Sequence, residues 1–343
     1  MVEGNSSPAE RFIRRLVKVA ICLIGLPFIL WAMGAIWYDL PIPLIARKIA
    51  AVLFLSAAGF LWFSGKCKWR MGAIGLVVLI IAWWFTLSPS NDRKWLADVA
   101  QTASAEINGD QFIFHNVRNF DYRSETDYIP RWETRTVNLS KLTGIDMAIN
   151  YWGSPYMAHP IVSFQFSDSP PLCFSIETRK EVGESYSAIG GIYRQYELIY
   201  VVADERDVIR VRTNYRKGEE IYLYRLAITP ENARARFMDY VTALNEIHAK
   251  PRWYNAVTTN CTTSIRSQHT TAKRNPWDWR ILVNGKADEM LYERGAFSTG
   301  GLAFGEFKKR SLINEAARAA NDAPDFSSRI RANAPSFANT KSR

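Results

Sequence analysis

A cysteine in a polar, threonine-rich turn is the residue of this chain whose type and setting could do chemistry. Cys261 lies in the segment Trp253–Ile265, where a turn rich in Asn and Thr leads into a short helical pattern. At a helix start, unpaired backbone N–H groups and the helix dipole favour an anion, which lowers the pKa of a thiol. The same N–H groups can stabilise a developing oxyanion. We therefore predict Cys261 as a nucleophile, the alternative being a small buried apolar residue.

A cysteine nucleophile needs a base, and four histidines are available: His115, His159, His248 and His269. His159 begins one strand pattern and Glu177 lies near the end of the next, with a short turn at 167–169 between them. If Phe166 pairs with Pro170, the hairpin register places Glu177 opposite His159 on the same face. An imidazole oriented by a carboxylate is the usual support of a cysteine nucleophile. The pattern thus predicts His159 as general base and Glu177 as its orienter.

Other interpretations of these residues remain open from the sequence. His159 could be a loop residue beside a proline, and Glu177 could be an exposed carboxylate paired with Arg179 or Lys180. A shift of one residue in register would turn Glu177 to the opposite face. His269, eight residues after the cysteine, is a second histidine that could approach the thiol.

Cys173 provides a structural alternative for the candidate nucleophile. It lies on the same predicted strand face as Glu177, whereas Cys22 and Cys67 fall in the apolar N-terminal part of the chain. In an oxidising compartment Cys173 and Cys261 could form a disulfide. Such a bridge would remove the nucleophile and leave a non-catalytic scaffold.

The sequence predicts neither a metal nor another cofactor. No His, Cys or Asp pair combines ligand spacing with a third ligand nearby, and the Gly-Gly pairs lack the Lys and Ser/Thr of a phosphate loop. The net charge of +10 is concentrated in residues 1–90, which contain nine Lys or Arg and three Asp or Glu. The remaining chain is nearly neutral and has no basic aromatic stripe, which argues against nucleic-acid binding.

Three uncharged apolar runs, Val19–Tyr38, Ile49–Gly65 and Met71–Leu87, follow a basic N-terminal segment. Each approaches the roughly 17–25 residues that a bilayer-spanning helix needs, so we predict a multi-pass membrane protein. Basic residues lie before the first run and between the second and third. The positive-inside rule places both segments in the cytoplasm and the chain after Leu87 outside.

The composition changes after Leu87, which gives a membrane domain at 1–90, a mixed α+β domain at 91–320 and a disordered tail at 321–343. Alternating patterns predict strands at 111–117, 134–139, 144–151, 161–166, 172–178, 198–202, 206–212 and 220–228. Amphipathic patterns predict helices at 94–106, from Thr229 to His248, and at 307–320.

Many short stretches of the outer domain resemble one bacterial membrane family. They are Ile107–Asp110, Val117–Arg123, Tyr151–Gly153, Ala158–His159, Ile176–Glu181, Gly183–Tyr186, Tyr196–Tyr200 and Tyr254–Thr263. The family is named for the N-terminal periplasmic domain of the Lnb-type lipoprotein N-acyltransferase. The resemblance covers roughly residues 91–300, so the membrane segment and the tail fall outside it.

The resemblance implies a domain in the periplasm, anchored in the bacterial inner membrane. It carries the roles of nucleophile and base onto Cys261 and His159, and it implies a permuted papain-like (NlpC/P60-like) fold. We expect a thiol acyltransferase or hydrolase that acts on an acyl-lipid or lipoprotein substrate. The alternatives are an envelope cysteine peptidase or amidase, and a scaffold in which Cys261 is structural.

Overall fold

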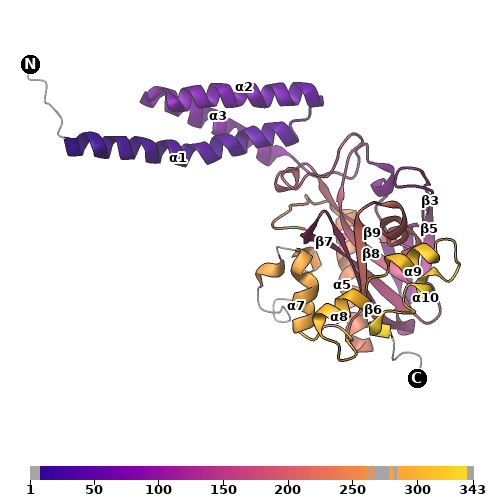
Figure 1. Ribbon diagram of the computed structural model, residues 1–343. Helices are drawn as coiled ribbons and strands as arrows, with labels where there is room; N and C mark the ends of the chain where they lie inside the picture. The colour runs from indigo at the N-terminus through magenta and orange to yellow at the C-terminus, as the bar shows by residue number, and fades with distance from the viewer. Residues whose placement is uncertain (1–7, 261–262, 266–277, 282–283, 338–343) are drawn as a thin grey trace, which may run out of the picture. The chain divides into compact units, whose positions relative to one another are not determined.

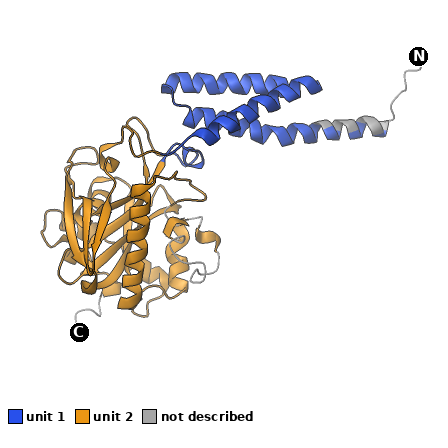
Figure 2. Ribbon diagram, turned by 180° about the vertical axis from the view of Figure 1, so that it is seen from behind, with its two compact units in different colours: residues 1–89, 187–196 blue, residues 90–186, 197–343 orange. Residues whose placement is uncertain are grey.

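The computed structural model describes residues 8–260, 263–265, 278–281 and 284–337 of the chain. It divides into two compact units, one formed by residues 1–89 and 187–196 and the other by residues 90–186 and 197–343 (Figure 2). The second unit is therefore interrupted by ten residues that belong to the first. We refer to residues 187–196 as the anchoring loop.

The first unit contains three long apolar helices: α1 (Pro8–Asp39), α2 (Leu44–Phe63) and α3 (Cys67–Thr86) (Figure 1). By length and composition, each is able to cross a membrane. The three apolar runs of the sequence are thus confirmed as helices. Lys66 begins the turn into α3, so the basic cluster expected between the second and third spans lies at that helix start.

The anchoring loop packs against the helices of its own unit. The Arg194 guanidinium lies 3.8 Å from the centroid of the Trp84 ring on α3, and its backbone N–H donates to the Asp39 carboxylate. The Trp84 indole N–H also donates to Asp39, over 2.7 Å. The Tyr193 ring stacks on Tyr38, with 5.3 Å between centroids. These contacts hold the loop at the ends of α1 and α3.

A twisted sheet forms the centre of the second unit, in the order β1-β2-β9-β8-β7-β6-β10, with β5 paired to β2. The strands are β1 (Ser104–Asn108), β2 (Gln111–Arg118), β5 (Trp132–Asn138), β6 (Leu142–Trp152), β7 (Ser154–Phe166), β8 (Leu172–Arg179), β9 (Glu197–Ala203) and β10 (Glu219–Arg225). A separate hairpin joins β3 (Asp121–Tyr122) to β4 (Tyr128–Ile129). Neighbours in the main sheet are antiparallel except β2 and β9. The mixed α+β class is therefore confirmed.

Helices cover both faces of this sheet, as Figures 1 and 2 show from opposite sides. One face packs against α5 (Pro230–Ala249) through aromatic edge-to-face contacts, among them Phe164 with Phe237 at 5.0 Å. The side chain of Thr229 accepts from a backbone N–H and caps α5, as the sequence predicts. The helices α7 (Ala287–Glu293) and α8 (Phe304–Arg310) follow later in the chain.

The opposite face of the sheet carries the candidate site. It packs against α4 (Glu205–Val208), the π-helix η4 (Val211–Tyr215), α9 (Asn314–Ala319) and α10 (Phe326–Arg329). Small and branched residues of the strands, including Ile161, Cys173 and Val201, form a buried core with Phe326 of α10. The site therefore lies beside a layer whose interior is buried and apolar.

Two predicted elements of this face are wrong. The expected strand at 206–212 is α4 followed by η4, because Asp204 caps α4 by accepting from the Arg206 N–H at 2.8 Å. The expected helix at 94–106 is a single 3-10 turn, Ala97–Val99, followed by β1. Trp95 and Val99 are buried as their spacing predicts, but β1 gains its hydrogen bonds by pairing with β2.

The C-terminal segment was also predicted wrongly. The helix expected at 307–320 is divided into α8 and α9 because Leu312 pairs with Tyr222 and the Ile313 N–H donates to a β10 carbonyl. Residues 321–337, expected to be disordered, pack on the sheet, where Phe326 is fully buried. Arg331 pairs there with buried carboxylates.

Candidate functional site

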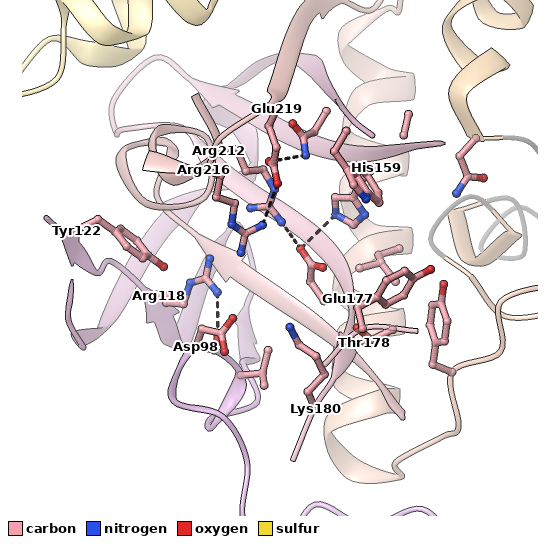
Figure 3. A pocket seen from close by; sticks show the side chains of 18 residues that line it. Asp98, Arg118, Tyr122, His159, Glu177, Thr178, Lys180, Arg212, Arg216 and Glu219 are labelled. Carbon is pink, nitrogen blue, oxygen red and sulfur yellow. Dashed lines mark hydrogen bonds and ion pairs between the residues drawn. The ribbon is translucent and has the colours of Figure 1, made fainter. Parts of the chain in front are cut away.

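His159 and Glu177 lie side by side on neighbouring strands. In the structure β7 and β8 pair in the expected register, with Ile161 opposite Ser175. The His159 Nε2 atom lies 2.7 Å from the Ser175 Oγ atom and 3.2 Å from Glu177 Oε1. The Ser175 hydroxyl donates to the same carboxylate oxygen over 2.6 Å. One nitrogen of the imidazole is therefore held by a hydroxyl and a carboxylate, and Figure 3 shows the contact of His159 with the Glu177 carboxylate.

A buried arginine from the opposite layer also holds the carboxylate. Arg212 Nη2 donates to Glu177 Oε1 over 2.6 Å, and its Nη1 donates to the Val208 carbonyl. Burial alone raises the pKa of Glu177, but the charges of His159 and Arg212 and the hydrogen bonds outweigh burial and hold that pKa well below its usual range. Glu177 is therefore a carboxylate at neutral pH.

Cys261 and His269 lie outside the described residues. The residues on either side of 261–262 are described, and they exchange two hydrogen bonds: Asn260 Oδ1 accepts from the Thr263 N–H over 2.9 Å, and the Asn260 N–H donates to Thr263 Oγ1 over 2.8 Å. The Asn260 side chain is buried. Tyr254, seven residues before the cysteine, lines the same cavity as His159.

Cys173 lies in the core. Its side chain has no exposed surface, and its thiol is free. Burial raises the pKa of Cys173 well above the ordinary thiol value, so thiolate is scarce there. The structure places Cys173 two residues from Ser175 on the site's face of β8, as a packing residue.

A cavity of about 210 Å³ opens beside His159 and Glu177. Its charged walls come from Asp98, Arg118, Glu177, Lys180, Arg212, Arg216 and Glu219. Most of these charges are paired: Arg118 with the buried Asp207 at 2.7 Å, Arg212 with Glu177, and Arg216 with Glu219 at 3.6 Å. The aromatic walls are Tyr122, Trp152, Tyr186 and Tyr254. The arrangement is that of a small polar pocket with an aromatic border.

Asn150 adds an unsatisfied acceptor to this cavity. It stands opposite His159 in the β6 and β7 pairing, and its Nδ2 donates to Glu219 Oε2 over 2.7 Å. Because a carboxylate only accepts, this contact fixes which end of the amide faces Glu219. The remaining Oδ1 is buried and has no hydrogen-bond partner among the residues that the structure describes. A ligand N–H or O–H in the cavity would satisfy it.

The sequence analysis did not identify Ser175, Arg212 or Asn150 as site residues. Arg212 and Arg216 are four residues apart. In a helix, this spacing places two side chains on the same face. It was therefore a signal against the predicted strand and in favour of a helix with both guanidinium groups on one side. Ser175 alternates with Glu177 on one strand, so the predicted hairpin already placed it on the site's face. Asn150 carries no comparable signal.

The other two described histidines, His115 and His248, lie away from the cavity. His248 contacts Thr102 Oγ1 at 2.9 Å, and His115 contacts Glu106 at 3.0 Å. Neither lines the cavity. Within the described residues, no group of His, Cys, Asp and Glu side chains could hold a metal ion.

Comparison with known proteins identifies the domain. The model of the Lnb N-terminal periplasmic domain matches residues 128–285, which include His159, Glu177 and Cys261. The match confirms the family expected from the sequence. No curated protein and no solved structure matches the chain. The apolar helices followed by this domain indicate a membrane protein with a periplasmic C-terminal domain.

Proposed function

Because residues 128–285 carry the Lnb N-terminal periplasmic domain, we propose that this protein is a cysteine-dependent acyltransferase or hydrolase of the inner membrane. Cys261 is the nucleophile, His159 the general base and Glu177 the group that orients it. The substrate is an acyl lipid or a lipoprotein. The fold in this proposal is a permuted papain-like one, in which a hairpin supplies the base and the cysteine follows at a helix start.

The buried contact of His159 with Ser175 and Glu177 is the observation that carries the proposal. A histidine that only packs in the core would not require a contact with an ionised carboxylate. Here Glu177 contacts His159 and is also held by the buried Arg212. Since Nε2 is engaged by this pair, Nδ1 is the nitrogen that would receive the thiol proton. The reciprocal hydrogen bonds of Asn260 and Thr263 are of the kind that begins a helix, and they support the expectation from the sequence for this segment.

The chemistry follows from these roles in two steps. His159 takes the proton of the Cys261 thiol, and the thiolate attacks the carbonyl carbon of an acyl ester. The tetrahedral intermediate expels the alcohol oxygen, which takes the proton back from the imidazolium, and a thioester remains. An amine or water then attacks the thioester with His159 again as base, so the acyl group leaves and the thiol is restored. Asn150 Oδ1 could accept a hydrogen bond from that second nucleophile.

The location of the domain favours a lipid substrate over a soluble one. The chain is joined to the apolar helices before Ser90 and on both sides of the anchoring loop. The cavity residue Tyr186 immediately precedes that loop. A substrate that is itself anchored in the bilayer would meet this domain at a high local concentration.

Intact-mass analysis of the full chain tests the proposal. After incubation with envelope lipids and rapid acid quenching, we expect an acyl adduct that is labile to hydroxylamine and absent from Cys261→Ala. Cys173→Ala is the matched control and should keep the adduct. An adduct formed with peptides and not with lipids would identify the envelope peptidase instead. A quantitative Cys173–Cys261 disulfide in the native protein would support the scaffold and contradict the proposal.

A further inference from the structure

The anchoring loop exposes a pair of isoleucine side chains. Its middle is a 3-10 turn, η3 (Gly190–Ile192), which follows Ile189. Gly190 and Gly191 are buried, whereas Ile189 keeps 59% of its surface exposed and Ile192 keeps 45%. Because side chains three residues apart eclipse one another in a 3-10 turn, both isoleucines lie on one side of the loop. The loop therefore has an apolar side that the described residues leave uncovered.

The same loop packs against α1 inside its apolar span. The Tyr193 ring centroid lies 6.3 Å from that of Trp31 and 5.3 Å from that of Tyr38. Gly34 makes room for this ring, because a Cβ atom at Gly34 would stand 2.0 Å from the Tyr193 hydroxyl oxygen. At a rise of 1.5 Å per residue, Gly34 lies roughly 7 Å along the helix from Asp39, the last residue of α1. The loop thus lies beside the last turns of the span and does not stand beyond its end.

The contacts with α3 give the loop a similar depth. The Arg194 guanidinium lies 3.8 Å from the centroid of the Trp84 ring and 5.6 Å from that of Phe85. Its Nη1 atom also donates to the Trp84 carbonyl over 2.6 Å. Phe85 is 69% exposed and lies in the apolar span, so its ring faces lipid where α3 crosses a bilayer. Tyr and Trp rings with an arginine are the groups that anchor a protein at a bilayer interface.

We propose that the anchoring loop is inserted in the bilayer, with the side chains of Ile189 and Ile192 in the leaflet at the C-terminal ends of α1 and α3. Lipid is the occupant of the apolar side because the loop packs on these spans at the level where the exposed Phe85 already meets acyl chains. Isoleucine is stabilised in such surroundings relative to water. The inserted loop attaches the chain to the membrane at 187–196 in addition to the three helices. This contact is independent of Cys261 and of any catalytic activity.

The depth of the loop can be measured on the full chain in vesicles of dioleoyl phosphatidylcholine. The four native cysteines are replaced by alanine, and a nitroxide is attached to Ile189→Cys or Ile192→Cys. Power saturation compares collisions with oxygen, which concentrates in lipid, and with a water-soluble nickel complex. Both positions should favour oxygen, as should the lipid-facing Val78→Cys in α3. The matched control is Ile129→Cys, at an isoleucine of β4 that is 50% exposed, and it should favour the nickel complex.

A second measurement uses the unlabelled thiols, because a nitroxide is itself apolar. In the same vesicles, a cationic methanethiosulfonate should modify Ile189→Cys and Ile192→Cys about tenfold more slowly than Ile129→Cys, since a thiol in apolar surroundings yields little thiolate. Dissolving the vesicles in dodecyl sulfate should make the three rates equal.

Two results would overturn the inference. Nickel collisions and thiol rates at Ile189 and Ile192 that equal those at Ile129 would place the loop in water. Labels that meet neither oxygen nor nickel would show that protein covers the loop, and dipolar broadening between labels would identify that protein as a second copy of the chain.

Discussion

At the scale of residues, the site is a chain of contacts that passes from a buried arginine to an imidazole. Arg212 holds Glu177, and Glu177 together with Ser175 holds His159 Nε2. Each link is charged or charge-assisted, and Arg212 and Ser175 are buried, which restricts the geometry of the contacts. One defined nitrogen of the imidazole, Nε2, is therefore fixed by these contacts.

The pH dependence of thiol alkylation tests the pairing of Cys261 with this imidazole. In the Cys173→Ala background, we expect the rate at which iodoacetamide modifies Cys261 to stay high as the pH falls through the ordinary thiol pKa of about 8.5, and to decline only at clearly lower pH. His159→Ala should raise the pH of that decline toward the ordinary thiol pKa, and it should abolish activity as completely as Cys261→Ala does. Because groups that act as a unit fail together, the double variant should be little worse than either single one. A profile that His159→Ala leaves in place would show that the two residues do not meet.

Glu177 is expected to contribute stability as well as orientation. Glu177→Gln leaves the buried Arg212 without its counter-charge, which should cost roughly 3–5 kcal/mol in the free energy of unfolding. Since the native pKa of Glu177 is depressed, its contribution is present above the unfolded value near 4.5 and is lost as pH falls through the native pKa.

Denaturant unfolding of both proteins at pH 7 and at acid pH measures this difference. The difference in the free energy of unfolding between the parent and Glu177→Gln should be largest at pH 7 and should become smaller below about pH 4. Glu246→Gln, at an exposed pair with Arg252, is the control and should change stability by less than about 1 kcal/mol. A gap that widens on acidification would contradict the assigned ionisation of Glu177.

At the scale of elements, the C-terminal segment completes the layer that carries the site. Arg331 reaches Asp146 at 2.9 Å and also pairs with Glu205. Both carboxylates have no exposed surface. Burial raises the pKa of Asp146 above its usual range despite the two arginines beside it. The segment thus supplies the guanidinium of Arg331, which pairs with two buried carboxylates of this layer.

Arg331→Met should therefore destabilise the periplasmic domain by roughly 3–5 kcal/mol, because two buried carboxylates lose a shared partner. Arg329→Met, which breaks only an exposed pair with Asp325, should cost less than about 1 kcal/mol. The midpoint of thermal unfolding of the full chain in detergent reports the difference. Equal midpoints for the two variants would mean that the segment adds nothing to stability, which is the behaviour of a disordered tail.

The elements that the sequence predicts correctly are those determined by residues close together in the chain. Strand alternation and a short turn are enough to give the β7 and β8 register and to bring His159 to Glu177. The segment around Arg212 was predicted wrongly because its apolar residues suit a strand as well as a helix, and only the Asp204 cap decides between them. The segment after Asp322 is rich in Ala, Ser and Asn, and its order depends on distant partners such as Asp146, which no local pattern reveals.

At the scale of the whole molecule, the membrane unit and the periplasmic domain are joined by more than one connection. The chain leaves the helices at residue 89, returns to their unit at 187 and leaves it again after 196. The returning loop is held by Arg194 on Trp84 and Asp39. In the proposed topology, all these connections need the ends of α1 and α3 to lie on the periplasmic side.

The orientation of the helices is the prediction on which the proposed location depends. Seven basic residues, Arg11, Arg14, Arg15, Lys18, Lys66, Lys68 and Arg70, lie on the two segments expected in the cytoplasm. An alkaline phosphatase fused after Asp92 should be active, because that enzyme requires the oxidising periplasm, and one fused after Gly65 should be inactive. A cytoplasmic reporter with the opposite requirement should give the reverse pattern at both positions. If the cytoplasmic reporter after Asp92 is active and the phosphatase is not, the domain lies in the cytoplasm. That result would contradict the proposed location, and the argument for a lipid substrate in the envelope would fail with it.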